Sequence, residues 1–145
     1  MAVTYSFEGT EVHVAGLRFR RPLVPAILTG PAASTPVPML VDSGADVSMI
    51  SLGLAKHLGL DLSRRDSAAG ISGGMPVFRS KVGVEIVHAG GTLPRLDVPV
   101  WVPTRRGLPP ELVLGRGVFF EAYDVTFRLG RGRTGEFVLT PARNR

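Results

Sequence analysis

Residues 39–51 read MLVDSGADVSMIS and place one acid, Asp42, between two apolar runs. The corner formed by Ser43 and Gly44 is typical of a turn, because Asp and Ser hydrogen-bond to nearby backbone and Gly accepts a positive φ. Since both flanks are apolar, we expect this turn to lie in the interior or on the floor of a cleft. An ionised carboxylate there costs free energy unless hydrogen bonds or a partner support it, which indicates a functional role.

The chemistry that suits such an acid is the activation of water by two carboxylates. One carboxylate takes a proton from the water while the other gives a proton to the scissile carbonyl oxygen. Two carboxylates in contact share one proton, because like charges at that distance cannot both ionise. No other aspartate lies in an Asp-Ser/Thr-Gly corner with apolar flanks, so one chain supplies half of the site. A two-fold homodimer would bring the two copies of Asp42 together.

The rest of the chain favours β structure, because short runs of Val, Ile, Phe and Thr are interrupted by 18 Gly and 12 Pro. We expect strands over 11–15, 17–28, 37–42, 46–51, 96–103 and 111–115, a loop over 29–36, a hairpin over 65–88 with GISGG at its tip, and a closing hairpin over 124–141. Apolar residues at spacings of three and four predict a helix over 52–60 that Gly59 ends, and 117–123 predicts a helical turn. We assign no element to residues 1–10.

Composition indicates one domain. The chain has 145 residues, of which 44% are hydrophobic and 20% charged, and this length can bury a core. The absence of Cys excludes disulfides, thiolate metal sites and thiol nucleophiles. No signal peptide is visible, and no apolar run approaches the ~18 residues that a membrane helix needs. We therefore expect a soluble, cytoplasmic protein. The preference for Arg over Lys, with abundant Ala, Gly and Pro, is typical of a GC-rich bacterial source.

A net charge of +5 raises the possibility of a nucleic-acid-associated protein. The arginines concerned are Arg105 and Arg106 in one loop, and Arg131, Arg133, Arg143 and Arg145 near the C-terminus. No aromatic residues are interleaved with them, as a single-strand stacking surface would require, and no helix-turn-helix or zinc-finger spacing occurs. The pattern therefore favours a solvated basic surface over a nucleic-acid site.

Three motifs in order resemble the retropepsin-like aspartic proteases, the single-domain dimeric relatives of retroviral protease. The first is LVDSGADVSMIS at 40–51, which matches an apolar-apolar-Asp-Thr/Ser-Gly-Ala pattern. The second is AGISGGM at 69–75, which resembles a glycine-rich flap tip that closes over substrate. The third is LVLGRG at 112–117, which resembles the Gly-Arg element before the family's short helix. The resemblance covers about residues 17–140 and leaves 141–145 as a basic tail of a single domain, 1–145.

The resemblance implies roles for the residues of the first motif. Asp42 matches the catalytic aspartate, and Ser43 matches the residue whose hydroxyl bonds across the dimer. Gly44 matches the glycine whose carbonyl faces the substrate backbone, and Ala45 completes the loop. Asp46 matches an acid that binds substrate main chain and pairs with the arginine of the Gly-Arg element.

The other two motifs would supply substrate contacts and support. The flap residues that would contact substrate are Gly70, Ile71, Ser72, Gly73, Gly74 and Met75. The resemblance implies that Val113 lines a side-chain pocket and that Leu114 packs by the Asp42 loop, followed by Gly115 and Arg116. An Asp46–Arg116 ion pair within one subunit would tie the active-site loop to the C-terminal helix.

The implied fold is mostly β: a small closed antiparallel barrel of the acid-protease type with one or two short helices and a flap hairpin. The implied activity is that of an aspartic endopeptidase, homodimeric, acting on extended polypeptides at acidic to mildly acidic pH without a metal or a cofactor. The alternative is a catalytically inactive dimeric module of the same fold that binds extended chains by strand addition.

Two departures from the family pattern affect these expectations. Gly117 follows Arg116 where the family has Asp or Asn, which weakens the expected cap of the next helix. The viral enzymes build their dimer from interleaved terminal strands, whereas this chain ends in a hairpin over 124–140. The form of the dimer contact is therefore left open.

Some residues have simpler interpretations. GISGG at 70–74 also matches the Gly-x-Ser-x-Gly nucleophile elbow of serine hydrolases, but that elbow requires a following helix, and the sequence after it predicts a strand. His57 is expected to be exposed on the predicted helix, with no second metal ligand near it. Trp101 is expected in the core or at an interface.

Overall fold

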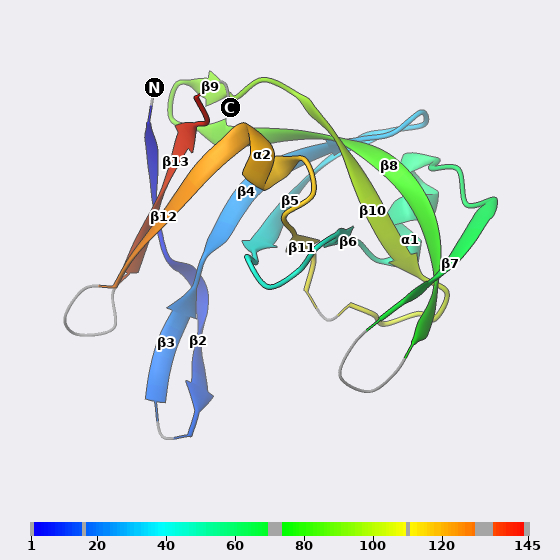
Figure 1. Cartoon of the computed structure of the whole chain (residues 1–145), viewed down its shortest axis with the longest axis horizontal. Coiled ribbons are helices and arrows are strands. Elements are labelled where there is room, and N and C mark those ends of the chain that lie inside the picture. The colour runs from blue at the N-terminus through cyan, green and yellow to red at the C-terminus, as the bar shows by residue number, and fades with distance from the viewer. Residues whose placement is uncertain (1, 16, 70–73, 110, 130–134, 144–145) are drawn as a thin grey trace.

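The computed structural model describes residues 2–15, 17–69, 74–109, 111–129 and 135–143, and they form a mostly β protein (Figure 1). The strands are β1 (Val3–Ser6), β2 (Glu8–Val14), β3 (Leu17–Arg21), β4 (Leu23–Thr29), β5 (Ser34–Val41), β6 (Ser48–Met49), β7 (Arg64–Ala68), β8 (Met75–His88), β9 (Gly91–Thr92), β10 (Leu96–Pro103), β11 (Val113–Leu114), β12 (Tyr123–Leu129) and β13 (Gly135–Pro141). The helices are α1 (Leu52–Leu58) and α2 (Phe119–Ala122).

Six strands form a closed barrel, as predicted. Their order is β10-β6-β11-β5-β4-β8, and β8 pairs again with β10 to close the ring. Most pairs are antiparallel, but β5 with β11 and β6 with β10 are parallel. The long β8 continues past the barrel and pairs with β7 in an antiparallel hairpin, as the sequence predicted. The barrel thus holds the strands on either side of Asp42 in a fixed register.

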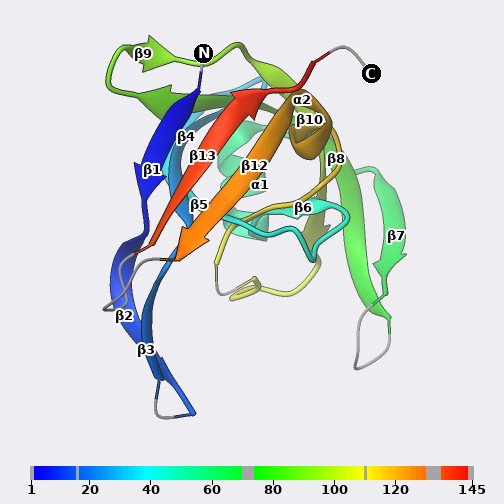
Figure 2. The same ribbon diagram turned by 60° about the vertical axis from the view of Figure 1, so that its left-hand side comes forward.

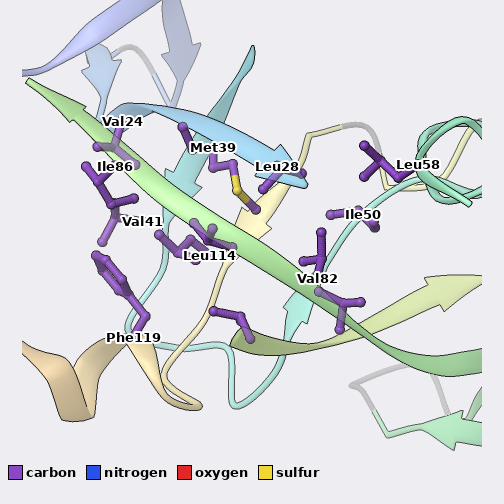
Figure 3. Close-up of a cluster of buried hydrophobic side chains, with 14 of the residues drawn as sticks. Val24, Leu28, Met39, Val41, Ile50, Leu58, Val82, Ile86, Leu114 and Phe119 are labelled. Atoms are coloured by element: carbon purple, nitrogen blue, oxygen red, sulfur yellow. The ribbon is translucent and has the colours of Figure 1, made fainter. Parts of the chain in front are cut away.

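The core fills the barrel with apolar side chains from nearly every strand. Figure 3 shows Val24, Leu28, Met39, Val41, Ile50, Val82, Ile86 and Leu114 together with Leu58 of α1 and Phe119 of α2, all of them buried. These residues alternate along β4 and β8, where the pattern places every second side chain inside. Burial of this set holds both helices against the barrel.

Helix α1 begins at Leu52, as the sequence indicates, and ends at Leu58, two residues before the predicted end. The hydroxyl oxygen of Ser51 accepts a hydrogen bond from the Leu54 N–H at 3.3 Å, which caps its first turn. Gly59 ends the helix at φ 72°, a conformation that favours glycine. The predicted face, Leu52 with Ala55 and Leu58, is buried.

A second sheet of three strands, in the order β1-β13-β12, lies beside the barrel (Figures 1 and 2). The closing hairpin β12–β13 was predicted, whereas β1 lies in a segment to which we assigned no element. Tyr5 of β1 stacks on Phe137 with ring centroids 5.1 Å apart, and its hydroxyl donates a hydrogen bond to the Val87 carbonyl at 3.0 Å. Tyr5 therefore joins this sheet to strand β8.

Burial changes the ionisation of both tyrosines in this region. It raises the pKa of Tyr5 to about 12, with a further contribution from nearby Tyr123. Burial also raises the pKa of Tyr123. Both phenols therefore stay neutral above the pH at which a solvated tyrosine ionises.

The predicted loop over 29–36 and the predicted strand over 17–28 were wrong. The segment 29–36 is not a loop, because β5 begins at Ser34 and only a tight turn separates it from β4. The predicted strand 17–28 is divided at Pro22 into β3, which pairs with β2, and β4, which enters the barrel. Proline lacks an amide hydrogen and so interrupts one ladder where another starts. The β2–β3 hairpin extends away from the barrel (Figure 1).

No helix among the described residues is long and apolar enough to cross a membrane.

Candidate active site

Asp42 directly follows β5, in the loop that leads to β6. Its backbone N–H donates a hydrogen bond to the Leu114 carbonyl at 3.1 Å, so β11 fixes the start of the loop. Its Oδ1 accepts a hydrogen bond from the Gly44 N–H at 2.8 Å, and its carbonyl accepts one from the Ala45 N–H at 3.3 Å. These bonds form a tight Asx-type turn that holds the carboxylate in one orientation.

The turn is more exposed in the single chain than the sequence indicated. Asp42 is half-buried, but Ser43 and Gly44 are exposed, so the turn does not lie in the interior of a single subunit. The other expected position, the floor of a cleft, stays a prediction. Its apolar flanks are buried as expected, with Val41 at 2% and Ile50 at 0% exposure. The flanking strands enter the core while the turn itself reaches the surface.

Two further backbone hydrogen bonds join this loop to the segment after β11. The Arg116 N–H donates to the Ala45 carbonyl at 2.8 Å, and the Gly117 N–H donates to the Asp46 carbonyl at 2.9 Å. Together with the bond from Asp42 to Leu114, they place the two motifs side by side. Leu114 is fully buried beneath them.

Ser48 contributes a buried link that the sequence analysis missed. Its hydroxyl oxygen accepts the Gly115 N–H at 2.9 Å, and the residue is 1% exposed. A Cβ on Gly115 would lie 2.8 Å from the Ala45 carbonyl oxygen and 2.8 Å from the backbone carbon of Val47. Only glycine permits this close approach. A serine between two apolar residues in a predicted strand was the signal that could have indicated its role.

The predicted ion pair between Asp46 and Arg116 is confirmed, since the Arg116 guanidinium donates to the Asp46 carboxylate. Both side chains are largely exposed, at 76% for Asp46 and 54% for Arg116. Solvent screens such a pair, so it contributes less to stability than the backbone bonds beside it. The Asp46 carboxylate therefore lies on the exposed side of the loop.

The helix that follows starts without a side-chain cap, in agreement with the weakened cap predicted at Gly117. The N-cap of α2 is Val118, at φ 68°. A β-branched residue rarely adopts a positive φ, so this position carries backbone strain. The N–H of Phe120 donates to the Arg116 carbonyl at 3.1 Å and continues the chain into the helix.

The expected flap is only partly described. The base of the hairpin is present, with Ala68 opposite Met75, and Gly74 is exposed. Gly70, Ile71, Ser72 and Gly73 lie outside the described residues. The segment after them is the strand β8 rather than a helix, which contradicts the serine-hydrolase interpretation.

A cavity of about 720 Å³ opens beside the active-site loop. Its lining consists of Pro31, Val47, Leu60, Asp61, Arg64, Asp66, Arg79, Ser80, Lys81, Pro99, Val100 and Trp101. Val47 is the lining residue that belongs to the loop between β5 and β6, the loop that also carries Asp42. Neither Asp42 nor Val113 is among the described residues that line it; Val113 is half-buried between Leu40 and Met49.

The charged side of the cavity holds three cationic and two acidic residues. Oδ2 of Asp66 lies 3.6 Å from Nε of Arg79. The pKa of Asp61 is lowered by hydrogen bonds from Ser63 and, to a smaller extent, by the charge of Arg64. Trp101 is half-buried and supplies part of the apolar side. The arrangement suits a ligand that has both an apolar and a charged part.

No group of three His, Cys, Asp or Glu residues in the described part of the chain could hold a metal ion. His57 is exposed on α1, as expected.

Comparison with known proteins places the chain in a family. A sequence model described as aspartyl protease matches residues 24–118, from β4 to the residue before α2. No curated protein matches the chain. Among solved structures, the EIAV protease in complex with the inhibitor HBY-793 is similar, with 21% sequence identity and a TM-score of 0.47 over 67% of this chain and 83% of that one. The family match covers more than half of the chain and includes both Asp42 and Arg116, so the chain belongs to the aspartyl protease family.

Proposed function

We propose that this protein is an aspartic endopeptidase that works as a homodimer, with the two Asp42 carboxylates forming its catalytic dyad. The observation that carries the proposal is the Asp42 turn, in which the Gly44 N–H donates a hydrogen bond to the carboxylate at 2.8 Å and orients it. The family to which the chain belongs, the aspartyl proteases, is consistent with this role. One chain offers a single acid in such a turn, and the chemistry needs two. A second copy supplies the other.

In the proposed reaction a water molecule lies between the two carboxylates, which share one proton. The ionised carboxylate takes a proton from the water as its oxygen attacks the peptide carbonyl carbon. The protonated carboxylate donates its proton to the carbonyl oxygen and gives a tetrahedral diol. Proton transfer to the amide nitrogen then breaks the C–N bond and releases an amine and a carboxylic acid. The dyad requires one proton, so activity is expected at acidic to mildly acidic pH.

Substrate binding follows from the surroundings of the turn. The Asp46 carboxylate lies on the exposed side of the loop and would accept hydrogen bonds from substrate N–H groups. The β7–β8 hairpin, including the predicted flap residues, would close over an extended chain and exclude water. Val113 would contribute an apolar contact. The cavity lined by Val47 and Trp101, together with three cationic and two acidic residues, would take a substrate side chain that has both an apolar and a polar part.

The test is digestion of casein and of a peptide library at pH 4 to 6 by the native protein and by Asp42→Asn. This substitution keeps the size of the side chain and removes its ability to hold the shared proton, so we expect cleavage to disappear. Asp97→Asn, at an exposed aspartate that pairs with Arg95 at 3.5 Å, serves as the matched control and should retain activity. Cleavage that survives Asp42→Asn would exclude the dyad mechanism.

The inactive peptide-binding alternative predicts a different result in the same assay. The native protein would bind library peptides without cutting them, and Asp42→Asn would bind them equally well. Recovery of intact peptides from the native protein would therefore favour the binding module over the enzyme.

A further inference from the structure

We propose that the outer edge of β12 is the dimer surface, where β12 of one copy pairs antiparallel with β12 of a second copy and Thr126 lies on the two-fold axis. The inference rests on the proposed function, since it identifies the partner that completes the site at Asp42. It joins the two three-stranded sheets into one sheet of six strands.

The first support is the open edge of β12. Within the described residues β12 pairs with β13 alone, and β13 separates it from β1. Figure 2 shows β12 as the outermost strand of this sheet on the side away from β1. An unpaired strand edge presents N–H and C=O groups that can pair with another chain. The strand is seven residues long, enough for a continuous ladder.

The second support is the self-complementary charge pattern of β12. In an antiparallel pair centred on Thr126, residue 124 of one copy lies opposite residue 128 of the other. Asp124 would therefore lie opposite the partner's Arg128, and Arg128 would lie opposite the partner's Asp124. The side chains of Asp124, Thr126 and Arg128 are all exposed in the single chain. Opposite charges directly across a ladder stabilise it, and two equivalent pairs form at once.

The third support is the apolar face of the same strand. In this register Val125 lies opposite the partner's Phe127, and both side chains point to the face that covers the core. Phe127 is 40% exposed, and in the described part of the chain it is the one large hydrophobic side chain that is exposed rather than buried or half-buried. Its ring contacts Phe7 and Phe137 at centroid distances of 6.5 and 6.3 Å. Pairing with a second copy would cover its remaining surface.

The other edge of this sheet does not specify a partner in the same way. Strand β1 has four residues, VTYS, and carries no charged side chain. It therefore offers neither charge complementarity nor a defined register.

Arg128 already bonds Glu136 on β13 at 3.2 Å, which holds its guanidinium on the exposed face of β12.

The charge pattern gives a test that does not depend on catalysis. We expect Asp124→Arg alone, and Arg128→Asp alone, to weaken dimerisation about tenfold or more, because each homodimer then has two like-charge contacts. A mixture of the two variants should dimerise like the native protein, since the heterodimer restores both opposite-charge contacts. Molar mass measured over a range of concentrations, with each copy also carrying Asp42→Asn to prevent digestion, gives the dissociation constants.

Single cysteines test the register, because the native chain has none. Thr126→Cys should form a disulfide-linked dimer on oxidation, since residues directly opposite have Cα atoms about 4.5–5.5 Å apart, within disulfide range. Arg128→Cys is the matched control: its two copies would be about 14 Å apart along the strands and should not link.

The outcomes separate this proposal from the proposed function. Recovery of the dimer in the mixture, together with linkage at Thr126 alone, supports the β12 surface. A dimer that neither charge variant weakens, or equal linkage of both cysteine variants, overturns it while leaving Asp42 chemistry intact. A persistent monomer overturns both. A dimer that pairs through β12 but cleaves nothing overturns only the enzymatic proposal.

Discussion

The buried hydroxyl oxygen of Ser48 accepts the N–H of Gly115 at 2.9 Å and thereby joins the Asp42 loop to the segment that carries Arg116. The two residues are 67 positions apart in the sequence. Ser48 is 1% exposed, so no solvent replaces the bond if the hydroxyl is removed. This relationship makes the geometry of the candidate site depend on a residue outside the Asp-Ser-Gly motif.

Replacement of Ser48 by Ala should lower the free energy of unfolding by about 1–3 kcal/mol, because the buried Gly115 N–H loses its partner. Urea unfolding followed by circular dichroism measures the change. Ser34→Ala is the control, since the exposed Ser34 hydroxyl forms its hydrogen bond with the Thr29 hydroxyl, at 2.9 Å, on the surface. Equal small effects of the two substitutions would show that the Ser48 bond contributes nothing to stability.

Gly115→Ala and Gly53→Ala should have opposite effects on stability. At Gly115 a Cβ would lie 2.8 Å from backbone atoms of Ala45 and Val47, so we expect a loss of about 1–3 kcal/mol. At Gly53, inside α1, a Cβ meets no atom within 4 Å, and the better helix propensity of Ala should add up to about 1 kcal/mol. Thermal unfolding of both variants is the measurement. A gain at Gly115 would contradict the close approach described above.

The Asp46–Arg116 pair should couple only weakly in stability, although it lies in the candidate site. A double-mutant cycle with Asp46→Asn and Arg116→Gln should give a coupling free energy of about 1 kcal/mol or less, and added salt should reduce it. Both side chains are more than half exposed, which is the physical reason. A coupling well above this size that persists in high salt would mean that the pair is shielded from solvent.

Alkaline pH should destabilise the protein through Tyr5, whose pKa is raised to about 12. The unfolded chain ionises this phenol near pH 10, whereas the folded chain holds its proton. The stability contributed by Tyr5 is therefore fully present below pH 10 and is lost as the pH rises from about 10 to 12.

The check is a titration of tyrosinate absorbance in the native and urea-unfolded protein. The chain has two tyrosines, and both should ionise at a higher pH in the native state than in the unfolded state. Tyr5→Phe should reduce the dependence of stability on pH above 10, while Tyr123 still titrates. Native and unfolded curves that coincide would contradict the burial of both phenols.

Local chemistry at particular residues made part of the fold predictable. The helix face of Leu52, Ala55 and Leu58, with Gly59 as its end, followed from spacing and backbone preference alone. The strand over 96–103 and the two hairpins followed from alternation and turn residues. The Asp46–Arg116 pair followed from a family resemblance rather than from the spacing of charges.

The remaining features depend on contacts that short sequence patterns do not encode. Strand β1 pairs with β13, and its four residues carry too short an alternation to be recognised without that partner. The exposure of Ser43 and Gly44 depends on the position of the β5–β6 loop at the surface of the barrel, which is set by contacts with β11. The role of Ser48 depends on Gly115 approaching it from a distant segment.

Pro36 of β5 fell in the segment that was predicted as a loop, and the positions of Pro36 and Pro38 in this strand have a further consequence. The Leu40 N–H donates to the Leu112 carbonyl, so the nitrogens of Pro36 and Pro38, at alternate positions, point to that same edge, away from β4. Strand β11 covers the edge only at Leu40 and Val41. Because Pro36 and Pro38 lack amide hydrogens, this part of the edge cannot donate hydrogen bonds to a further strand. The prolines therefore disfavour uncontrolled polymerisation at this edge of the barrel, in contrast to the edge of β12 that we propose as the dimer surface.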